Sequence, residues 1–253
     1  MLTSLFTSLD VSVMQIILVA LLALCSFIVS TVVGVGATLL LVPILIFFMP
    51  PATAVAIAAP VMLMNNIVKS AVFRRHVKWR TVLLTGLTAW PLAAISATFT
   101  GVVADNFLRV TIGVLILGSF LIEYIFKSKF ELQDKGLLAS GIVIGGASGF
   151  CGAAGVPVAF AYRNHGLVKE NFVATVAVLA VGLQTVKIPV YVSGGLLEAQ
   201  HLPLILLLIA MSLCGIFIGK KVLKTISPTL FRIFLDILLL GLALWLIYSS
   251  IKN

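Results

Sequence analysis

Negative charge is scarce in this 253-residue chain, which has 8 Asp and Glu residues against 17 Lys and Arg residues. Charged residues of both signs make up only 10% of the chain, whereas hydrophobic residues make up 61%. This polar surface is too small to cover a soluble globule, so the composition predicts an integral membrane protein. We expect no nucleic-acid binding despite the net charge of +9, because the basic residues lie in short loops between apolar runs.

Other signals are also missing. The three cysteines, Cys25, Cys151 and Cys214, lack the spacing of a metal site or a disulfide framework. The sequence contains no Walker A string, so ATP-driven transport would need a partner chain. No Lys or Arg precedes the first apolar run, which we therefore expect to be a retained helix rather than a signal peptide. We expect neither a metal ion nor another cofactor.

The apolar runs predict an all-α, polytopic membrane protein. They are long enough for helices of about 20 residues and lack the alternating segments of an outer-membrane barrel. Full spans are expected at 52–73, 81–103, 107–126, 172–192, 202–219 and 230–250. Two further segments, 13–49 and 136–162, are interrupted by glycines and are expected to form broken helix hairpins.

An internal duplication relates the two halves of the chain. At an offset of 118 residues, Gly34 aligns with Gly152, and Val68-Lys69 aligns with Val186-Lys187. Matches of Val and Ala are common in so apolar a chain, but two aligned lysines within apolar helices are not. The sequence therefore predicts a first repeat over 1–126, a linker over 127–135 and a second repeat over 136–253.

The distribution of basic residues predicts that the repeats are inverted in the membrane. The segments 74–80, 127–135, 163–171 and 220–228 hold 12 of the 17 Lys and Arg residues, which is typical of cytoplasmic loops. If all four face the cytoplasm, each hairpin re-enters the membrane and each half crosses it an odd number of times. An alternative is that 13–33 crosses outright, since 21 residues at about 1.5 Å each suffice. We expect a multi-pass protein of the cell membrane.

The glycine-rich breaks are the first candidate site. Non-helical backbone at membrane depth needs protein or a watery cavity around it, and each following helix presents free N–H groups that attract anions. The alternative is that these glycines only permit close helix packing. The candidate residues here are Gly34, Gly36, Thr38, Cys151, Gly152 and Gly155.

Lys69 and Lys187 are the second group of candidates. A lysine at the centre of a span costs about 2.5–3.5 kcal/mol, and no Asp or Glu lies deep in any predicted span to neutralise it. An incoming anion would supply the counter-charge; the alternative is that each lysine extends to the membrane surface. Asn66 and Gln184, three residues earlier, either donate to anion oxygens or bond neighbouring helices.

Taken together, the two breaks and the segments that follow them resemble a known family. The matching residues are Gly34-Val35-Gly36-Ala37 with Pro43 and Ala54, and 149–155 (GFCGAAG) with 172–175 (FVAT). The chain is similar to the sulfite exporter TauE/SafE family, also described as the toluenesulfonate uptake permease family, although the family is richer in glycine in its first motif. The resemblance implies a membrane transporter for sulfur-containing anions such as sulfite, sulfonates or sulfoacetate, in either direction.

Two other functions are compatible with the residues. Gly146-Ala147-Ser148-Gly149 resembles the nucleophile motif of rhomboid-type intramembrane proteases, but that chemistry needs a histidine beside the serine. His76, His165 and His201 all fall in predicted loops, so we expect no enzyme. An anion channel is the other alternative. The expected partners are a small anionic substrate and the lipid bilayer, and the sequence leaves open whether copies form a homo-oligomer.

Overall fold

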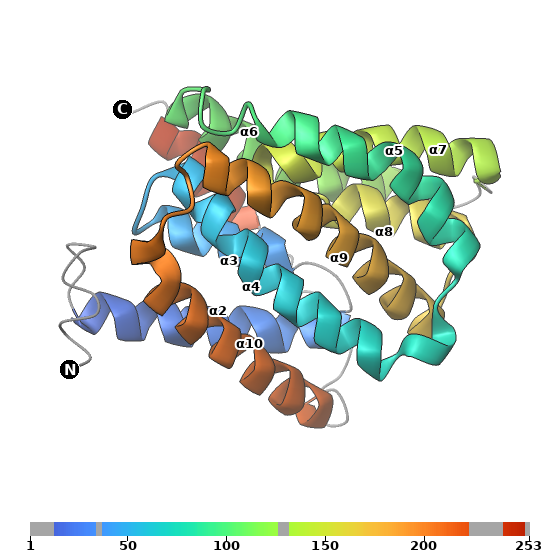
Figure 1. Cartoon of the computed structure of the whole chain (residues 1–253), viewed down its shortest axis with the longest axis horizontal. Coiled ribbons are helices and arrows are strands. Elements are labelled where there is room, and N and C mark those ends of the chain that lie inside the picture. The colour runs from blue at the N-terminus through green and yellow to red at the C-terminus, as the bar shows by residue number, and fades with distance from the viewer. Residues whose placement is uncertain (1–12, 34–36, 126–131, 223–239, 251–253) are drawn as a thin grey trace.

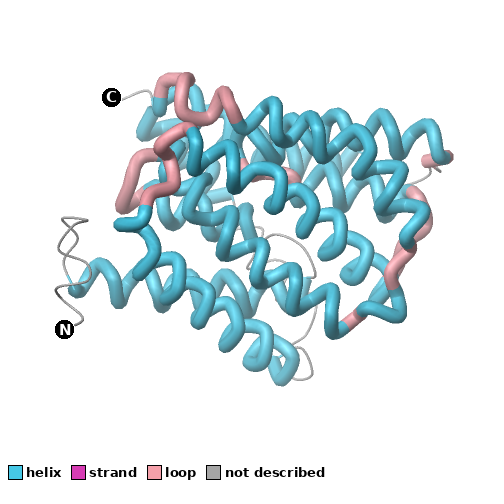
Figure 2. Tube along the Cα trace, in the orientation of Figure 1, coloured by secondary structure: helices cyan, strands magenta, loops and turns pink. Residues whose placement is uncertain are grey.

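A computed structural model describes residues 13–33, 37–125, 132–222 and 240–250, and all regular structure in these ranges is helical (Figure 2). The all-α prediction is therefore confirmed for the described chain. The helices are α2 (Val13–Val33), α3 (Ala37–Ile46), α4 (Pro51–Val72), η2 (Arg74–His76), α5 (Trp79–Ala97), α6 (Asp105–Ile125), α7 (Asp134–Cys151), α8 (Gly155–Asn164), α9 (Lys169–Ser193), η3 (Ala199–His201), α10 (Leu202–Val222) and a last helix, Leu240–Ser250.

Four of the described helices are long and apolar enough to cross a membrane, namely α2, α4, α9 and α10 with η3. Three of them correspond to the predicted spans 52–73, 172–192 and 202–219. The predicted span 81–103 is too long, because α5 ends at Ala97 and hydrogen-bonded turns follow it. Thr98, Thr100 and Gly101 have low helix propensity, which explains the early end.

The first hairpin is described only in part, because Gly34 and Gly36 lie outside the described residues. The 21 residues of α2 reach about 32 Å, long enough to cross a bilayer, so re-entry of 13–49 stays a prediction. The next helix, α3, ends at Ile46, and α4 begins at Pro51. A proline suits the first helical position because its missing N–H would have no intrahelical partner there.

The second break is fully described. The helix α7 ends at Cys151, and Gly152 follows in the left-handed conformation with φ of 73°. This backbone conformation favours glycine, which explains why the chain turns there. After two more residues α8 begins at Gly155 and runs for ten residues, as α3 does in the first half.

Equivalent helices of the two halves begin at equivalent positions. Ala37, the first residue of α3, shifts by 118 residues onto Gly155, the first residue of α8. Pro51 of α4 shifts by the same number onto Lys169 of α9. The helix boundaries thus agree with an internal duplication, whereas the inverted orientation of its halves in a membrane stays a prediction.

The helices α5 and α7 lie side by side along the molecule (Figure 1), and small residues allow their close approach. Gly141, Gly145 and Gly149 of α7 face α5, and a Cβ built at Gly145 would lie 3.0 Å from the Cα of Ala89. Ser96 Oγ also donates to the Gly145 carbonyl at 3.1 Å. For these three glycines the packing explanation holds.

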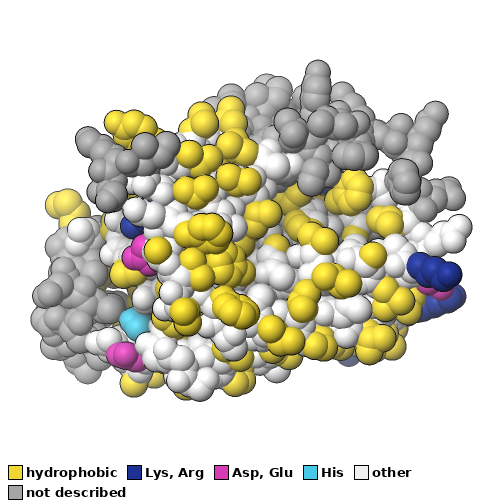
Figure 3. All heavy atoms as spheres, turned by 90° about the horizontal axis from the view of Figure 1, so that it is seen from above, with side chains coloured by type: hydrophobic (Ala, Val, Ile, Leu, Met, Phe, Trp, Pro, Cys, Tyr) yellow, Lys and Arg dark blue, Asp and Glu magenta, His cyan; other side chains and the backbone are white. Residues whose placement is uncertain are grey.

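The described parts of three predicted basic loops lie together at one end of the molecule. Arg80 forms an ion pair with Asp134, and the Leu132 amide donates to the Asn164 carbonyl at 3.0 Å. These contacts bring 74–80, 132–135 and 163–169 together, at the right in Figure 1. Figure 3 shows apolar side chains spread over the face between the charged ends, as expected of a chain that lies across a membrane.

Candidate functional site

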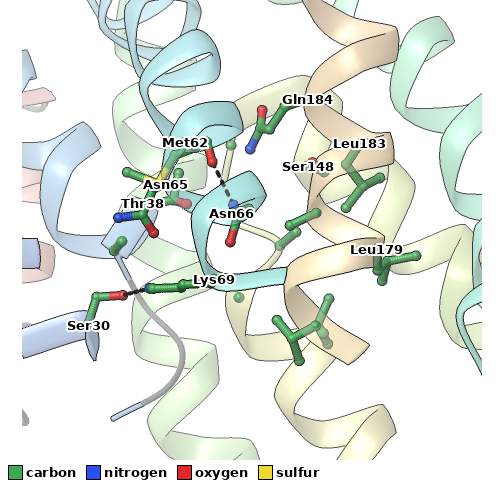
Figure 4. A pocket seen from close by; sticks show the side chains of 17 residues that line it. Ser30, Thr38, Met62, Asn65, Asn66, Lys69, Ser148, Leu179, Leu183 and Gln184 are labelled. Carbon is green, nitrogen blue, oxygen red and sulfur yellow. Dashed lines mark hydrogen bonds between the residues drawn. The ribbon is translucent and has the colours of Figure 1, made fainter. Parts of the chain in front are cut away.

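A cavity of about 60 Å³ lies where the starts of α3 and α8 meet the middle of α4 and α9 (Figure 4). Residues of α2 and α7 complete its lining. Since one water needs about 10–15 Å³ by this measure, the cavity has room for about four waters or one small polyatomic ion. Its polar lining residues Asn65, Lys69 and Gln184 are buried, and away from water an ion interacts more strongly with nearby charges and dipoles.

The two short helices direct their N-terminal ends at this cavity. Ala37 and Thr38 of α3 line it from one side, and Gly155 of α8 lines it from another. Gly152 also lines the cavity, and a Cβ built on it would lie 3.5 Å from Thr38 Cγ2. The first N–H groups of a helix lack intrahelical partners and carry about half a positive charge, so two such ends favour an anion between them.

Lys69 supplies the cationic side chain of the cavity. It is 7% exposed, and its ammonium donates to Ser30 Oγ at 3.2 Å (Figure 4). Among the residues that the structure describes, no Asp or Glu lines the cavity, and the one ion pair joins Arg80 to Asp134. The Lys69 side chain is therefore buried in the protein, and no described carboxylate neutralises it.

Three amide side chains border the same cavity. The Asn66 amide nitrogen donates to the Met62 carbonyl of its own helix at 2.8 Å, rather than to a neighbouring helix. Gln184 is 5% exposed, and its Oε1 has no hydrogen-bond partner. Asn65 is 1% exposed, and neither Nδ2 nor Oδ1 has a partner. Sequence reasoning overlooked Asn65, although two adjacent asparagines in an apolar helix were a signal for it.

Lys187 lies outside the cavity lining and stabilises the break in α7 instead. Its ammonium donates to the Ser148 carbonyl at 3.0 Å, and the Tyr191 hydroxyl donates to the Gly149 carbonyl at 2.7 Å. These carbonyls lie in the last turn of α7. The Ser148 carbonyl also accepts from the Gly152 amide and the Gly149 carbonyl from Thr100 Oγ1, so the two side chains add to the bonds that hold the helix end. A cation is also favourable at the negative end of a helix dipole.

The two lysine contacts are equivalent within the repeat. Lys69 bonds Ser30 and Lys187 bonds Ser148, each 39 residues earlier in the chain. Ser30 shifts by 118 residues onto Ser148, so the offset that aligns the lysines also aligns their partners. Sequence reasoning overlooked Ser30, which this alignment could have indicated. Cys151, another candidate, lies outside the lining and its Sγ contacts the Ala147 carbonyl of its own helix at 3.2 Å.

The protease alternative finds no support at Ser148. In the described part of the chain no hydrogen bond joins a histidine to this serine. His165 Nδ1 lies 2.6 Å from the Leu132 carbonyl, and His201 Nδ1 accepts from the Glu198 amide at 3.1 Å. The described histidine contacts thus join His165 to Leu132 and His201 to Glu198 rather than to Ser148.

Apolar helices of membrane-spanning length around a buried polar cavity define the class of multi-pass helical membrane proteins. A family model described as Sulfite exporter TauE/SafE matches residues 18–246, nearly the whole chain. The chain therefore belongs to the sulfite exporter TauE/SafE family of membrane transporters. Searches of curated proteins and of solved structures gave no match.

Proposed function

We propose that the protein moves a small sulfur-containing oxyanion, such as sulfite or a small sulfonate, across the cell membrane. The anion binds in the cavity between α3, α4, α8 and α9. Lys69 is the observation that carries this proposal, since a buried ammonium without a carboxylate partner is costly unless a ligand neutralises it. The family supports the transport of such a solute, and the cavity supports its location.

The geometry suits a compact anion. The positive ends of α3 and α8 flank the cavity, and Lys69 and Gln184 reach it from α4 and α9. Together these groups surround a bound oxyanion with donors from several directions, as preorganised anion sites do. The cavity volume of about 60 Å³ accommodates a compact oxyanion such as sulfite.

The duplication suggests how the site changes sides. We propose that 1–126 and 136–253 are inverted halves and that movement of one half against the other opens the cavity alternately to each side. Export needs no ATP in this scheme. An interior-negative potential of about 100 mV contributes about 2.3 kcal/mol for each negative charge that leaves the cell.

The test removes the cavity's cationic side chain. Lys69→Met keeps the length of the side chain but removes its charge, so we expect sulfite affinity to fall at least tenfold, since a desolvated charge-assisted contact contributes about 1.5–3 kcal/mol. Binding is measured with purified protein by ligand-induced thermal stabilisation, and transport is measured as sulfite efflux from proteoliposomes.

Lys78→Met is the matched control, because it removes one positive charge from a loop outside the cavity. Its sulfite affinity and efflux rate are expected to equal those of the wild type. Equal sulfite binding by Lys69→Met and wild type would place the anion elsewhere and reject the proposal.

A further inference from the structure

Asn65 is a buried polar residue of the cavity whose side chain has no hydrogen-bond partner within the protein. Its carboxamide is 1% exposed, lines the cavity and has no hydrogen-bond partner on either polar atom. Buried amide groups are almost always paired, because an unpaired one loses its bonds to water and gains nothing in return. A molecule in the cavity that forms hydrogen bonds with Asn65 would remove this cost.

A ligand that pairs both polar atoms of Asn65 directly accepts one hydrogen bond and donates another. Turning the Asn65 carboxamide by 180° exchanges its nitrogen and oxygen, but either orientation presents one donor group and one acceptor. Gln184 Oε1 is a second buried acceptor without a partner at the same cavity. A fully deprotonated oxyanion has only acceptors, so it would leave Asn65 and Gln184 oxygens unsatisfied.

The charge of the lining leads to the same conclusion. Among the described residues that line the cavity, Lys69 is the one with a positively charged side chain. A single negative charge on the ligand would be balanced by this ammonium. A second negative charge would be buried with only helix dipoles to stabilise it, which is unfavourable in a low-dielectric site.

We infer that the cavity selects a singly charged oxyanion that retains one hydroxyl, which for sulfite is hydrogensulfite rather than the dianion. The charged oxygens lie toward Lys69 and the starts of α3 and α8. The hydroxyl donates to the Asn65 or Gln184 side-chain oxygen, and the Asn65 amide donates back to the ligand. This inference rests on the proposed function, and Asn65 is its specificity-determining residue.

Methanesulfinate is the matched probe, because it has a methyl group where hydrogensulfite has its hydroxyl and carries the same single charge. Wild-type protein is expected to bind hydrogensulfite at least about tenfold more tightly, since a site built for a hydroxyl discriminates against an analogue that lacks it. Sulfate, a dianion throughout the range used, is expected to compete weakly with both.

The pH dependence separates the two forms of sulfite. Above the second ionisation of sulfurous acid, the affinity for total sulfite relative to methanesulfinate should fall about tenfold per pH unit, because the hydrogensulfite fraction falls in that way. Methanesulfinate keeps its charge, so any titration of the protein changes both affinities alike and cancels in the ratio. A ratio that is constant or rises with pH would overturn the inference.

Substitution of Asn65 gives a second test. Asn65→Leu removes the amide donor from both ligands but the acceptor of the hydroxyl from hydrogensulfite alone. It should therefore weaken hydrogensulfite binding more than methanesulfinate binding and remove the preference, whereas Asn65→Ser, which retains a donor and an acceptor, should restore part of the preference. Retained methanesulfinate binding shows that the variant is folded. If Asn65→Leu keeps the full preference, Asn65 does not select the hydroxyl.

These outcomes distinguish the inference from the function on which it rests. Failure of both ligands to bind, or binding of both that is insensitive to Lys69→Met, would reject the anion site itself. Binding of both ligands that depends on Lys69 but shows no preference would retain the anion site and reject only the selection of a hydroxyl.

Discussion

Lys69 and Lys187 occupy equivalent positions of the repeat but have different surroundings. Lys69 lines the cavity and bonds one serine hydroxyl, whereas Lys187 bonds a backbone carbonyl near the end of α7. Both ammonium groups are buried, so burial makes a similar unfavourable contribution for each. The difference in stability between a variant that lacks the Lys69 ammonium and one that lacks the Lys187 ammonium should therefore reflect the different hydrogen bonds that the two groups form.

We expect Lys187→Met to be less stable than Lys69→Met by about 1–2 kcal/mol, because Lys187 donates to a backbone carbonyl at the end of α7, whereas Lys69 donates to one serine hydroxyl. The measurement compares apparent melting temperatures of the two purified variants in the same detergent without added anion. Because both variants lose one charge, each is the control for the other. A lower melting temperature for Lys69→Met would contradict the capping role of Lys187.

At the scale of helices, the glycines of α7 have two separate roles. Gly141, Gly145 and Gly149 face α5 and permit close packing, whereas Gly152 allows the left-handed turn that ends the helix. The sequence predicted a break at this cluster because glycines and the repeat coincide there. It could not assign a role to each glycine, since φ and the neighbouring helix decide which role applies.

Gly145→Ala is expected to lower the apparent melting temperature by several degrees, because the added Cβ meets the backbone of α5 near Ala89. Gly146→Ala is the matched control one residue away, where a Cβ meets nothing within 4 Å. The control should be as stable as wild type or up to about 1 kcal/mol more stable, because alanine favours a helix. Thermal unfolding measures both, and equal destabilisation would show that α5 and α7 are not in close contact there.

At the scale of the whole molecule, hydropathy predicted the class and most of the helices, because span length and apolar composition are local properties of the sequence. The repeat aligned Lys69 with Lys187 and pointed to the breaks. It could not show that Lys69 lines the cavity and Lys187 does not, because this depends on how the two halves pack together. Asn65 was missed for the same reason, since burial without a partner is a property of the assembled helices.

Selection of a singly charged ligand predicts how efflux responds to voltage. A tenfold concentration ratio corresponds to about 1.4 kcal/mol, and 100 mV corresponds to about 2.3 kcal/mol per charge. The net flux of a singly charged anion that is not coupled to another ion is therefore zero at a membrane potential of about 60 mV. A dianion would balance at about 30 mV. Proteoliposomes with a tenfold sulfite ratio and equal pH on both sides, clamped at a series of potentials, measure the voltage of zero net flux. Methanesulfinate is the control for one charge, and a sulfite value near 30 mV, or no voltage dependence, would contradict the prediction.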